Sequence, residues 1–229
     1  TNPTGNVITD DELEQLDALA KTNKVPLIID GAYGLPFPGL IYTPATPFWN
    51  DNTIVCLSLS KFSLPGARTG IVVANEETIQ TISGINAIIN LASGSFGAAL
   101  TTHLVASGEI IDLSQKVVRP AYEAQLAFAQ NTLHTVMDRT IPYAMHKPEG
   151  AMFLWLWFKD MPISSQALYE RLKKQGVVVV SGHDFFVGIT DDWQHQHECI
   201  RINYAAQSPE RIAKGLQIIA QEVRKAYLG

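Results

Sequence analysis

Cysteine is scarce in this 229-residue chain, which holds only Cys56 and Cys199. Two cysteines that lie far apart, without a C-x-x-C spacing, exclude a disulfide framework and a paired-thiol redox motif. A composition of this kind is typical of proteins in the reducing cytoplasm, and we expect a cytoplasmic location.

Long apolar runs and clusters of positive charge are also missing. No stretch approaches the roughly 20 apolar residues that a membrane-spanning helix requires, and the first residues do not have the basic and apolar regions of a signal peptide. The net charge is -5 and no basic run is longer than Lys173 and Lys174, so electrostatics gives no reason to expect nucleic acid or an anionic membrane as a partner. The expected ligands are small molecules.

The composition that remains is that of a globular protein. Hydrophobic residues make up 46% and charged residues 17% of the chain, which is near the average for folded domains and far from disordered or fibrous proteins. The length allows one large domain or two modest ones. Residues 1–5 are turn formers with no preceding element to connect, which suggests a truncated sequence.

Apolar periodicity predicts helices and three short strands in the first half of the chain. Thr9 and Glu12 form a capping box, after which leucines recur at helical spacing. The predicted helices cover residues 10–22, 76–89, 96–107 and 109–137, the last with a kink or boundary at Pro120, and the predicted buried strands cover 25–29, 53–59 and 70–74. The proline-rich segment 34–52 is predicted to be an irregular loop.

The pattern changes after Pro120. We predict a strand over 151–158, a helix over 165–175, a strand over 177–180, and a last helix that begins at Pro209 with Ser208 as its cap. The expected fold class is therefore α/β, with a larger layer over residues 1–120 and a smaller α/β unit over residues 121–229.

A lysine follows the second predicted strand, within the segment SLSKFSLPGARTG at residues 58–70. Ligands of open α/β sheets bind at the carboxyl ends of the strands. There Lys61 can form a Schiff base with a carbonyl cofactor, while the neighbouring hydroxyls and Arg68 are suitable donors to a phosphate group. The alternative for a motif this short is a surface lysine on a solvated loop.

Further motifs occur in the order that is typical of one known family. They are Asn2-Pro3-Thr4-Gly5, Asp30-Gly31-Ala32-Tyr33, Lys147-Pro148-Glu149-Gly150-Ala151-Met152-Phe153 and Cys199-Ile200-Arg201-Ile202-Asn203-Tyr204. Together with the lysine segment they make essentially the whole chain resemble the class I/II aminotransferases of fold type I, whose cofactor is pyridoxal 5'-phosphate (PLP). The resemblance implies that residues 1–120 are the C-terminal part of the PLP-binding large domain, a mixed sheet with helices, and that residues 121–229 are the small C-terminal domain.

The resemblance makes Lys61 the residue that forms the Schiff base with PLP, and Asp30 the partner of the protonated pyridine nitrogen. A carboxylate there keeps the nitrogen cationic, so that the ring can take up electrons released at the substrate Cα. Tyr33 and Asn2 resemble the pair that hydrogen bonds the cofactor's 3-oxygen. From the residues alone, Asp30 and Asn2 could also be ordinary turn formers, and Tyr33 a packed aromatic.

Ser58, Ser60 and Arg68 resemble the phosphate clamp of the family, and Arg201 resembles the arginine that binds the substrate α-carboxylate through a bidentate fork. Arg68 follows Lys61 by seven residues, where many relatives have eight, so this loop is one residue shorter. Each arginine could instead be a surface residue, Arg68 in an ion pair and Arg201 on a strand face.

The segment around His195, His197 and Cys199 offers three possible metal ligands at alternate positions. The usual zinc patterns bring in a second ligand cluster from elsewhere in the sequence, and this chain has no such cluster. We therefore expect a polar loop there and no metal.

Residues 146–158 and 182–186 most resemble the branch of the family that acts on valine, or a similar aliphatic amino acid, and on pyruvate. The implied products are alanine and 2-ketoisovalerate, and the implied assembly is a homodimer. One alternative is another fold type I activity, such as a β-lyase with the same lysine and aspartate. The other is a noncatalytic ligand-sensing module, although no helix-turn-helix or basic segment accompanies it.

In the family, the glycine-containing phosphate loop and the aromatic that stacks on the cofactor lie ahead of the region that this chain resembles. We therefore expect the isolated chain to bind PLP weakly or not at all, and to be inactive. A titration with PLP followed by absorbance tests this, and we expect no saturable band from a protein-bound Schiff base. A saturable band that is lost in Lys61→Ala would contradict the expectation.

Overall fold

The structure is a computed structural model that describes residues 1–229 and divides into two compact units. One unit is Val7–Ala121, and the other joins Thr1–Asn6 to Tyr122–Gly229. The first six residues thus pack with the C-terminal part of the chain, which the sequence pattern did not indicate. The assignment of the two units as large and small domain stays a prediction.

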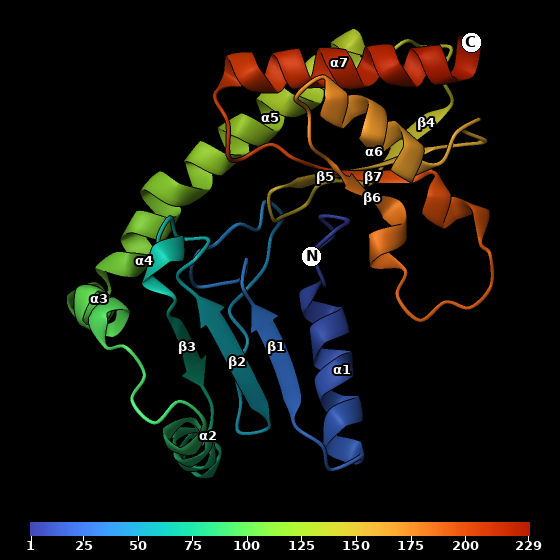
Figure 1. Ribbon diagram of the computed structural model, residues 1–229. Coiled ribbons are helices and arrows are strands. Elements are labelled where there is room, and N and C mark those ends of the chain that lie inside the picture. The colour runs from blue at the N-terminus through green and yellow to red at the C-terminus, as the bar shows by residue number, and fades with distance from the viewer. The chain divides into compact units, whose positions relative to one another are not determined.

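The unit Val7–Ala121 contains a three-stranded sheet with helices (Figure 1). Its elements are α1 (Asp10–Thr22), β1 (Leu27–Gly31), β2 (Thr53–Ser58), the 3-10 turn η1 (Pro65–Ala67), β3 (Gly70–Val73), α2 (Glu76–Ile89), α3 (Phe96–Ser107) and α4 (Glu109–Leu113). The predicted capping box is present, since the Thr9 side chain accepts from the Glu12 amide and the Glu12 carboxylate accepts from the Thr9 amide.

The sheet has the order β1-β2-β3, with β1 parallel to β2 and β3 antiparallel to β2. One face packs into the apolar core of this unit, where Val55 and Leu57 of β2 meet Phe37, Leu59 and other apolar side chains. The prediction of buried strands is therefore correct for this face alone. On the opposite face Ile28 is 64% exposed and Val72 36% exposed.

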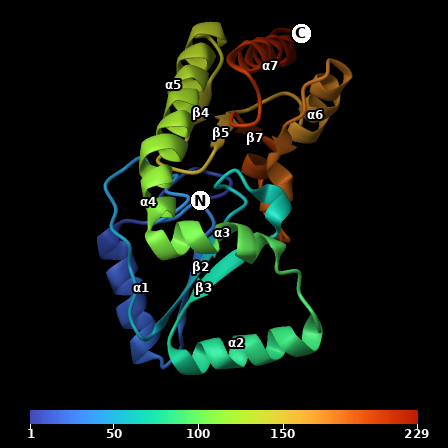
Figure 2. The ribbon, with the colours of Figure 1, turned by 90° about the vertical axis from the view of Figure 1, so that its left-hand side faces the viewer.

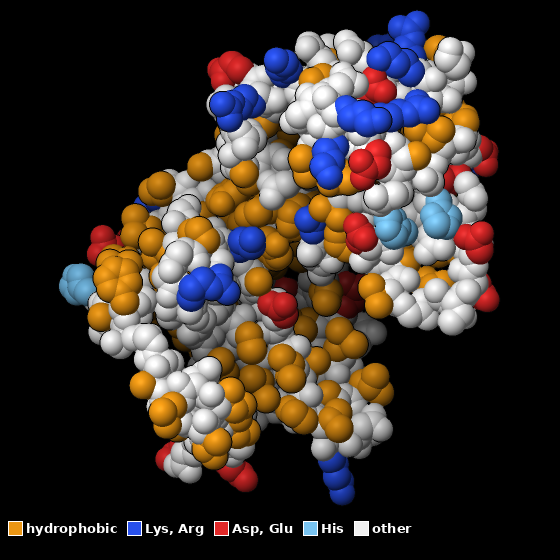
Figure 3. Space-filling model, viewed as in Figure 1, with side chains coloured by type: hydrophobic (Ala, Val, Ile, Leu, Met, Phe, Trp, Pro, Cys, Tyr) orange, Lys and Arg blue, Asp and Glu red, His pale blue; other side chains and the backbone are white.

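The open face of the sheet continues into an apolar surface on α2, which has no buried residue. Figure 3 shows hydrophobic side chains gathered over the strands and α2. The most exposed of them on α2 are Ile88 (82%) and Ile89 (73%). Exposed apolar side chains gathered in this way are unusual on a surface in water, and large patches of them are typical of interaction sites.

The helix predicted over residues 109–137 is interrupted by a π-helical turn just before Pro120. α4 ends at Leu113, a π-helical turn follows over Ser114–Val118, and α5 is Arg119–Val136. The Arg119 amide donates to the Ser114 carbonyl, five residues back. Because Pro120 has no amide hydrogen, a helix that continues through it must adjust its hydrogen bonds.

The unit that ends at Gly229 contains a four-stranded antiparallel sheet of the order β4-β5-β7-β6. Its elements after α5 are β4 (Tyr143–Met145), β5 (Phe153–Phe158), α6 (Ser165–Lys174), β6 (Val180–Ser181), the 3-10 turns η3 (Gly182–Phe185) and η4 (Gln194–His197), β7 (Cys199–Asn203) and α7 (Pro209–Leu228). The strand predicted over 177–180 is wrong in extent, because only Val180 and Ser181 pair with β7.

The two faces of this sheet differ in chemistry. Leu154, Leu156 and Ile200 are fully buried, and α6 and α7 lie over one side of the sheet (Figures 1 and 2). Side chains alternate along a strand, so Trp155 and its register partner Arg201 lie on the face opposite to Leu154 and Leu156. None of the helices combines the length and the apolar composition that a bilayer span requires.

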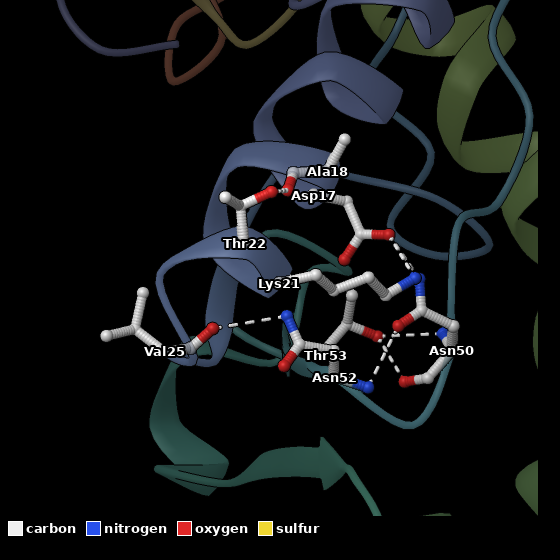
Figure 4. A network of polar contacts seen from close by, with 8 residues as sticks. All are labelled: Asp17, Ala18, Lys21, Thr22, Val25, Asn50, Asn52 and Thr53. Atoms are coloured by element: carbon white, nitrogen blue, oxygen red, sulfur yellow. Dashed lines mark hydrogen bonds and ion pairs between the residues drawn. The ribbon is translucent and has the colours of Figure 1, made fainter.

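A polar network ties α1 to the start of β2 (Figure 4). Asp17 is 6% exposed, and its Oδ2 accepts hydrogen bonds from Lys21 Nζ (2.7 Å) and Asn50 Nδ2 (2.9 Å). Asn50 also bonds Thr53, and Asn52 Nδ2 donates to the Val25 carbonyl next to β1. The network therefore fixes where β1 and β2 begin, and with it the position of their carboxyl ends.

The hydrogen bond from Lys21 is the main cause that lowers the pKa of the Asp17 carboxyl. A lowered folded-state pKa stabilises the fold above the unfolded pKa of about 3.9, and this contribution is lost as the pH falls through the folded pKa. We expect Asp17→Asn to lower the melting temperature at pH 7, with a smaller difference from the wild type below about pH 3. Thermal unfolding measures this, and the exposed Glu14→Gln on the same helix is the matched control.

Candidate active site

Chemically active side chains meet at one edge of the three-stranded sheet. Asp30 pairs in register with Cys56 near the carboxyl end of β1, and Ser58 at the end of β2 pairs with Gly70 at the start of β3. Since β1 and β2 are parallel and β3 runs the other way, both carboxyl ends and the loop with Lys61 lie at the same edge. Ligands of α/β sheets bind at such an edge.

Two buried apolar side chains hold the Lys61 loop. Leu59 and Phe62, on either side, are 0% and 6% exposed. The Leu59 carbonyl accepts from the Phe62 amide at 3.1 Å, and the Ser60 amide donates to Ser58 Oγ at 3.2 Å. The half-buried Lys61 is thus fixed at its backbone, and its ammonium lies 5.7 Å from the centre of the Tyr33 ring.

Asp30 lies on the exposed face of β1, with its Oδ1 accepting the Ala32 amide at 3.0 Å. This hydrogen bond forms the local turn expected of an aspartate after a strand. The carboxylate also affects its neighbour on β2: burial first, and then the charge of Asp30, raises the pKa of the Cys56 thiol. Asp30 is therefore a turn former with a carboxylate directed to the open face.

Arg68 is exposed and adopts a left-handed conformation with φ 46°. Its Nη1 lies 3.5 Å from the Pro65 carbonyl oxygen. The loop is held from α3, because a Cβ on Gly97 would collide with the Thr69 side chain and with the Ala67 carbonyl. Gly97 is not among the predicted site residues, and its only signal in the sequence is the run Ser93-Gly94-Ser95 just before α3.

Asn2 and Arg201 are brought together in the other unit, where Arg201 Nη1 donates to Asn2 Oδ1 at 2.5 Å. The turn that carries Asn2 is anchored on the loop at residues 146–150. The Gly5 carbonyl accepts from the amides of Glu149 and Gly150, each at 2.9 Å. Gly5 has φ 77°, and a Cβ there would lie 3.3 Å from Pro148 Cα, so glycine is required for this contact.

The structure therefore collects the predicted site residues in two groups. Asp30, Tyr33, Ser58, Ser60, Lys61 and Arg68 lie in the unit Val7–Ala121, and Asn2 and Arg201 lie in the other unit. The contact between Asn2 and Arg201 was not predicted. Neither were Phe153 and Phe185, whose ring centres lie 4.3 Å and 5.0 Å from the guanidinium carbon of Arg201.

The histidine-rich segment has partners of its own. His197 Nε2 lies 2.9 Å from Asp192 Oδ1, and His195 Nε2 lies 3.5 Å from Cys199 Sγ. Burial, with the nearby Glu198 charge, raises the pKa of Cys199 to about 12, so this thiol is protonated at neutral pH. The structure contains no group of three or more His, Cys, Asp or Glu residues arranged to hold a metal ion.

Comparison with known proteins gives matches over nearly the whole chain. The model of the family described as aminotransferase class I and II matches residues 1–219. The valine–pyruvate aminotransferase of Escherichia coli K12 is 48% identical over 99% of this chain and 54% of its own length. The chain thus spans about half the length of this curated relative.

Two crystal structures have the same fold. One is valine-pyruvate aminotransferase from Salmonella typhimurium LT2, with 46% identity, a TM-score of 0.91, and coverage of 100% of this chain and 58% of that one. The other is a putative amino-acid aminotransferase from Psychrobacter arcticum 273-4, with 49% identity, a TM-score of 0.94, and coverage of 100% and 52%. The chain belongs to the class I and II aminotransferases, the PLP-dependent enzymes of fold type I.

Proposed function

We propose that this chain carries the lysine-anchoring part of a PLP-dependent enzyme that transfers the amino group of valine, or a similar aliphatic amino acid, to pyruvate. The products are alanine and 2-ketoisovalerate. The observation that carries the proposal is the shared sheet edge, where Lys61 follows β2 and Asp30 lies near the end of the adjacent parallel strand. The 48% identity to a valine–pyruvate aminotransferase supports the choice of substrates.

The residues at this edge fit PLP by their chemistry. Lys61 supplies an amine for the cofactor aldehyde, and Ser58, Ser60 and Arg68 are hydroxyl and guanidinium donors suited to a phosphate. When bound, PLP supplies an electron sink for the carbanion that forms at the substrate Cα. No other lysine follows a strand at this edge, so the anchoring role goes to Lys61.

Lys61 also serves as the base of the reaction. With PLP bound, the Lys61 amine would remove the proton from the substrate Cα and later return a proton, as general base and then general acid. The buried Leu59 and Phe62 on either side restrict the backbone, so that the side chain alone has to move. A base held in this way reaches a fixed proton position at low entropic cost.

Asp30 pairs with the pyridine nitrogen and keeps it protonated. Its Oδ1 is engaged by the Ala32 amide, which orients the carboxylate and leaves Oδ2 for the nitrogen. Tyr33, whose ring lies beside the Lys61 ammonium, donates its phenolic hydrogen to the cofactor's 3-oxygen. A donor at this oxygen stabilises negative charge there.

Asn2 has its amide orientation set by Arg201. Because Oδ1 accepts from Arg201 Nη1, Nδ2 is the group of Asn2 that can donate, and the family resemblance assigns this donor to the cofactor's 3-oxygen. Arg201 binds the substrate carboxylate with its remaining N–H groups, in the bidentate geometry that a guanidinium provides. This hydrogen bond therefore links Arg201, which binds the substrate carboxylate, to Asn2, which binds the cofactor.

We further propose that the enzyme is a homodimer and acts in the cytoplasm. The assembly rests on the family resemblance. The location is supported by the two cysteines, which form no disulfide. The rival activity is a β-lyase, which would use the same Lys61 and Asp30 and release ammonia from a substrate with a β leaving group.

The test uses the holoenzyme, by which we mean the PLP-loaded protein of family length that contains this chain. Product analysis of this holoenzyme with valine and pyruvate should give equal amounts of alanine and 2-ketoisovalerate. Lys61→Ala should reduce the rate by about 10² to 10⁴-fold, as loss of an acid–base group does. Arg201→Lys keeps the charge but loses the fork, so it should raise KM for valine by about tenfold. The exposed Arg211→Lys on α7 is the control, and release of ammonia without alanine would contradict the proposal.

A further inference from the structure

Arg201 lies among aromatic rings on the outer face of β5 and β7. Its guanidinium carbon is 4.3 Å from the centre of the Phe153 ring and 5.0 Å from that of Phe185. Phe153 projects from the same face of the sheet as Arg201, because Trp155, two residues on, is the register partner of Arg201. Phe185 reaches the guanidinium from η3, a separate turn.

Phe185 is supported from behind by Trp155. The two rings meet edge to face, with centres 5.4 Å apart and planes at 90°. Trp155 is only 2% exposed, so it is a fixed support. Edge-to-face geometry is the favoured arrangement of such rings, and the position of Phe185 is therefore set by the strand that faces Arg201.

The η3 turn is also fixed at its first residues. A Cβ on Gly182 would lie 2.6 Å from the Gln196 carbonyl oxygen and 2.7 Å from Cys199 Cβ, so the turn is pressed against the segment that enters β7. Before it, the hydroxyls of Ser165 and Ser181 lie 2.6 Å apart, and Ser181 Oγ lies 2.8 Å from His183 Nδ1. These contacts fix the start of the turn that carries Phe185.

An aromatic ring next to a guanidinium has a specific effect on how that group binds anions. The ring attracts the cation through its π face and leaves the N–H groups in the guanidinium plane available. One Nη1 hydrogen of Arg201 goes to Asn2. The N–H groups of a guanidinium lie in one plane, which is the geometry that a carboxylate matches.

We propose that Phe185 is a positioning residue for carboxylate binding: with Phe153 it holds the Arg201 guanidinium in the orientation that accepts a carboxylate in its plane. The inference deepens the proposed function, because the carboxylate is the one common to the amino acid and the keto acid substrates. It assigns to Phe185 a part in the affinity for both substrates and none in proton transfer.

The test is binding of 3-methylbutanoate, an aliphatic carboxylate without an amino group, to the holoenzyme by calorimetry. We expect Phe185→Leu to weaken binding by about tenfold, because leucine fills the space but has no π face. Phe185→Tyr keeps the ring and should bind within about twofold of the wild type. The control is Phe128→Leu, since Phe128 lies on α5 with 37% of its surface exposed.

Steady-state kinetics gives a second readout. Phe185→Leu should raise KM for valine and for pyruvate and leave kcat nearly unchanged, whereas a general loss of structure would lower kcat and the melting temperature together. If Phe185→Leu does not fold, Phe185→Met takes its place under the same criteria.

Two results would overturn the inference. One is a folded Phe185→Leu that binds the carboxylate as tightly as the wild type, and the other is a Phe185→Tyr that binds as weakly as Phe185→Leu. The proposed function fails separately, when wild-type enzyme with valine and pyruvate forms no alanine. In that case the titration with 3-methylbutanoate still decides whether Phe185 positions Arg201.

Discussion

The parallel pairing of β1 with β2 is the constraint on which the site depends. It brings the carboxyl ends of two strands to one edge, and the antiparallel β3 returns from the same edge. Asp30 and Lys61, which are 31 positions apart in the sequence, are brought to the same edge of the sheet by this pairing. The Asp17 network secures the opposite ends of the strands, so the register at the site is set by contacts far from the chemistry.

In the second unit, strand pairing likewise positions Arg201, the residue proposed to bind the substrate carboxylate. β5 and β7 place Arg201 opposite Trp155, and the aromatic rings and Asn2 then restrict a side chain that would otherwise have many rotamers. Ordering the guanidinium before the substrate arrives lowers the entropic cost of binding. Contacts within one unit therefore position Lys61 and Asp30, and contacts within the other position Arg201.

Much of this arrangement could be predicted from the sequence. Helix starts such as the Thr9 capping box are local, and the residues after each strand are brought to one edge by general rules of α/β sheets. The strand predicted over residues 177–180 was wrong in extent. An apolar β-branched segment has the pattern of a strand whether or not a neighbouring strand pairs with it. The exposure of Ile28 could not be predicted either, since it depends on what covers the sheet. Residues 182–186 resemble a family motif, but the contact of Phe185 with Arg201, 16 positions away, could not be predicted because it depends on how the turn folds.

The measurement that tests the central claim most directly is the location of the cofactor on the polypeptide. Borohydride converts a Schiff base into a stable secondary amine, so reduction of the holoenzyme followed by peptide mass spectrometry reveals the lysine that carried PLP. We expect the pyridoxyl group on Lys61 and on no other lysine. A label on a different lysine, with Lys61 unmodified, would contradict the account of the sheet edge as the cofactor site.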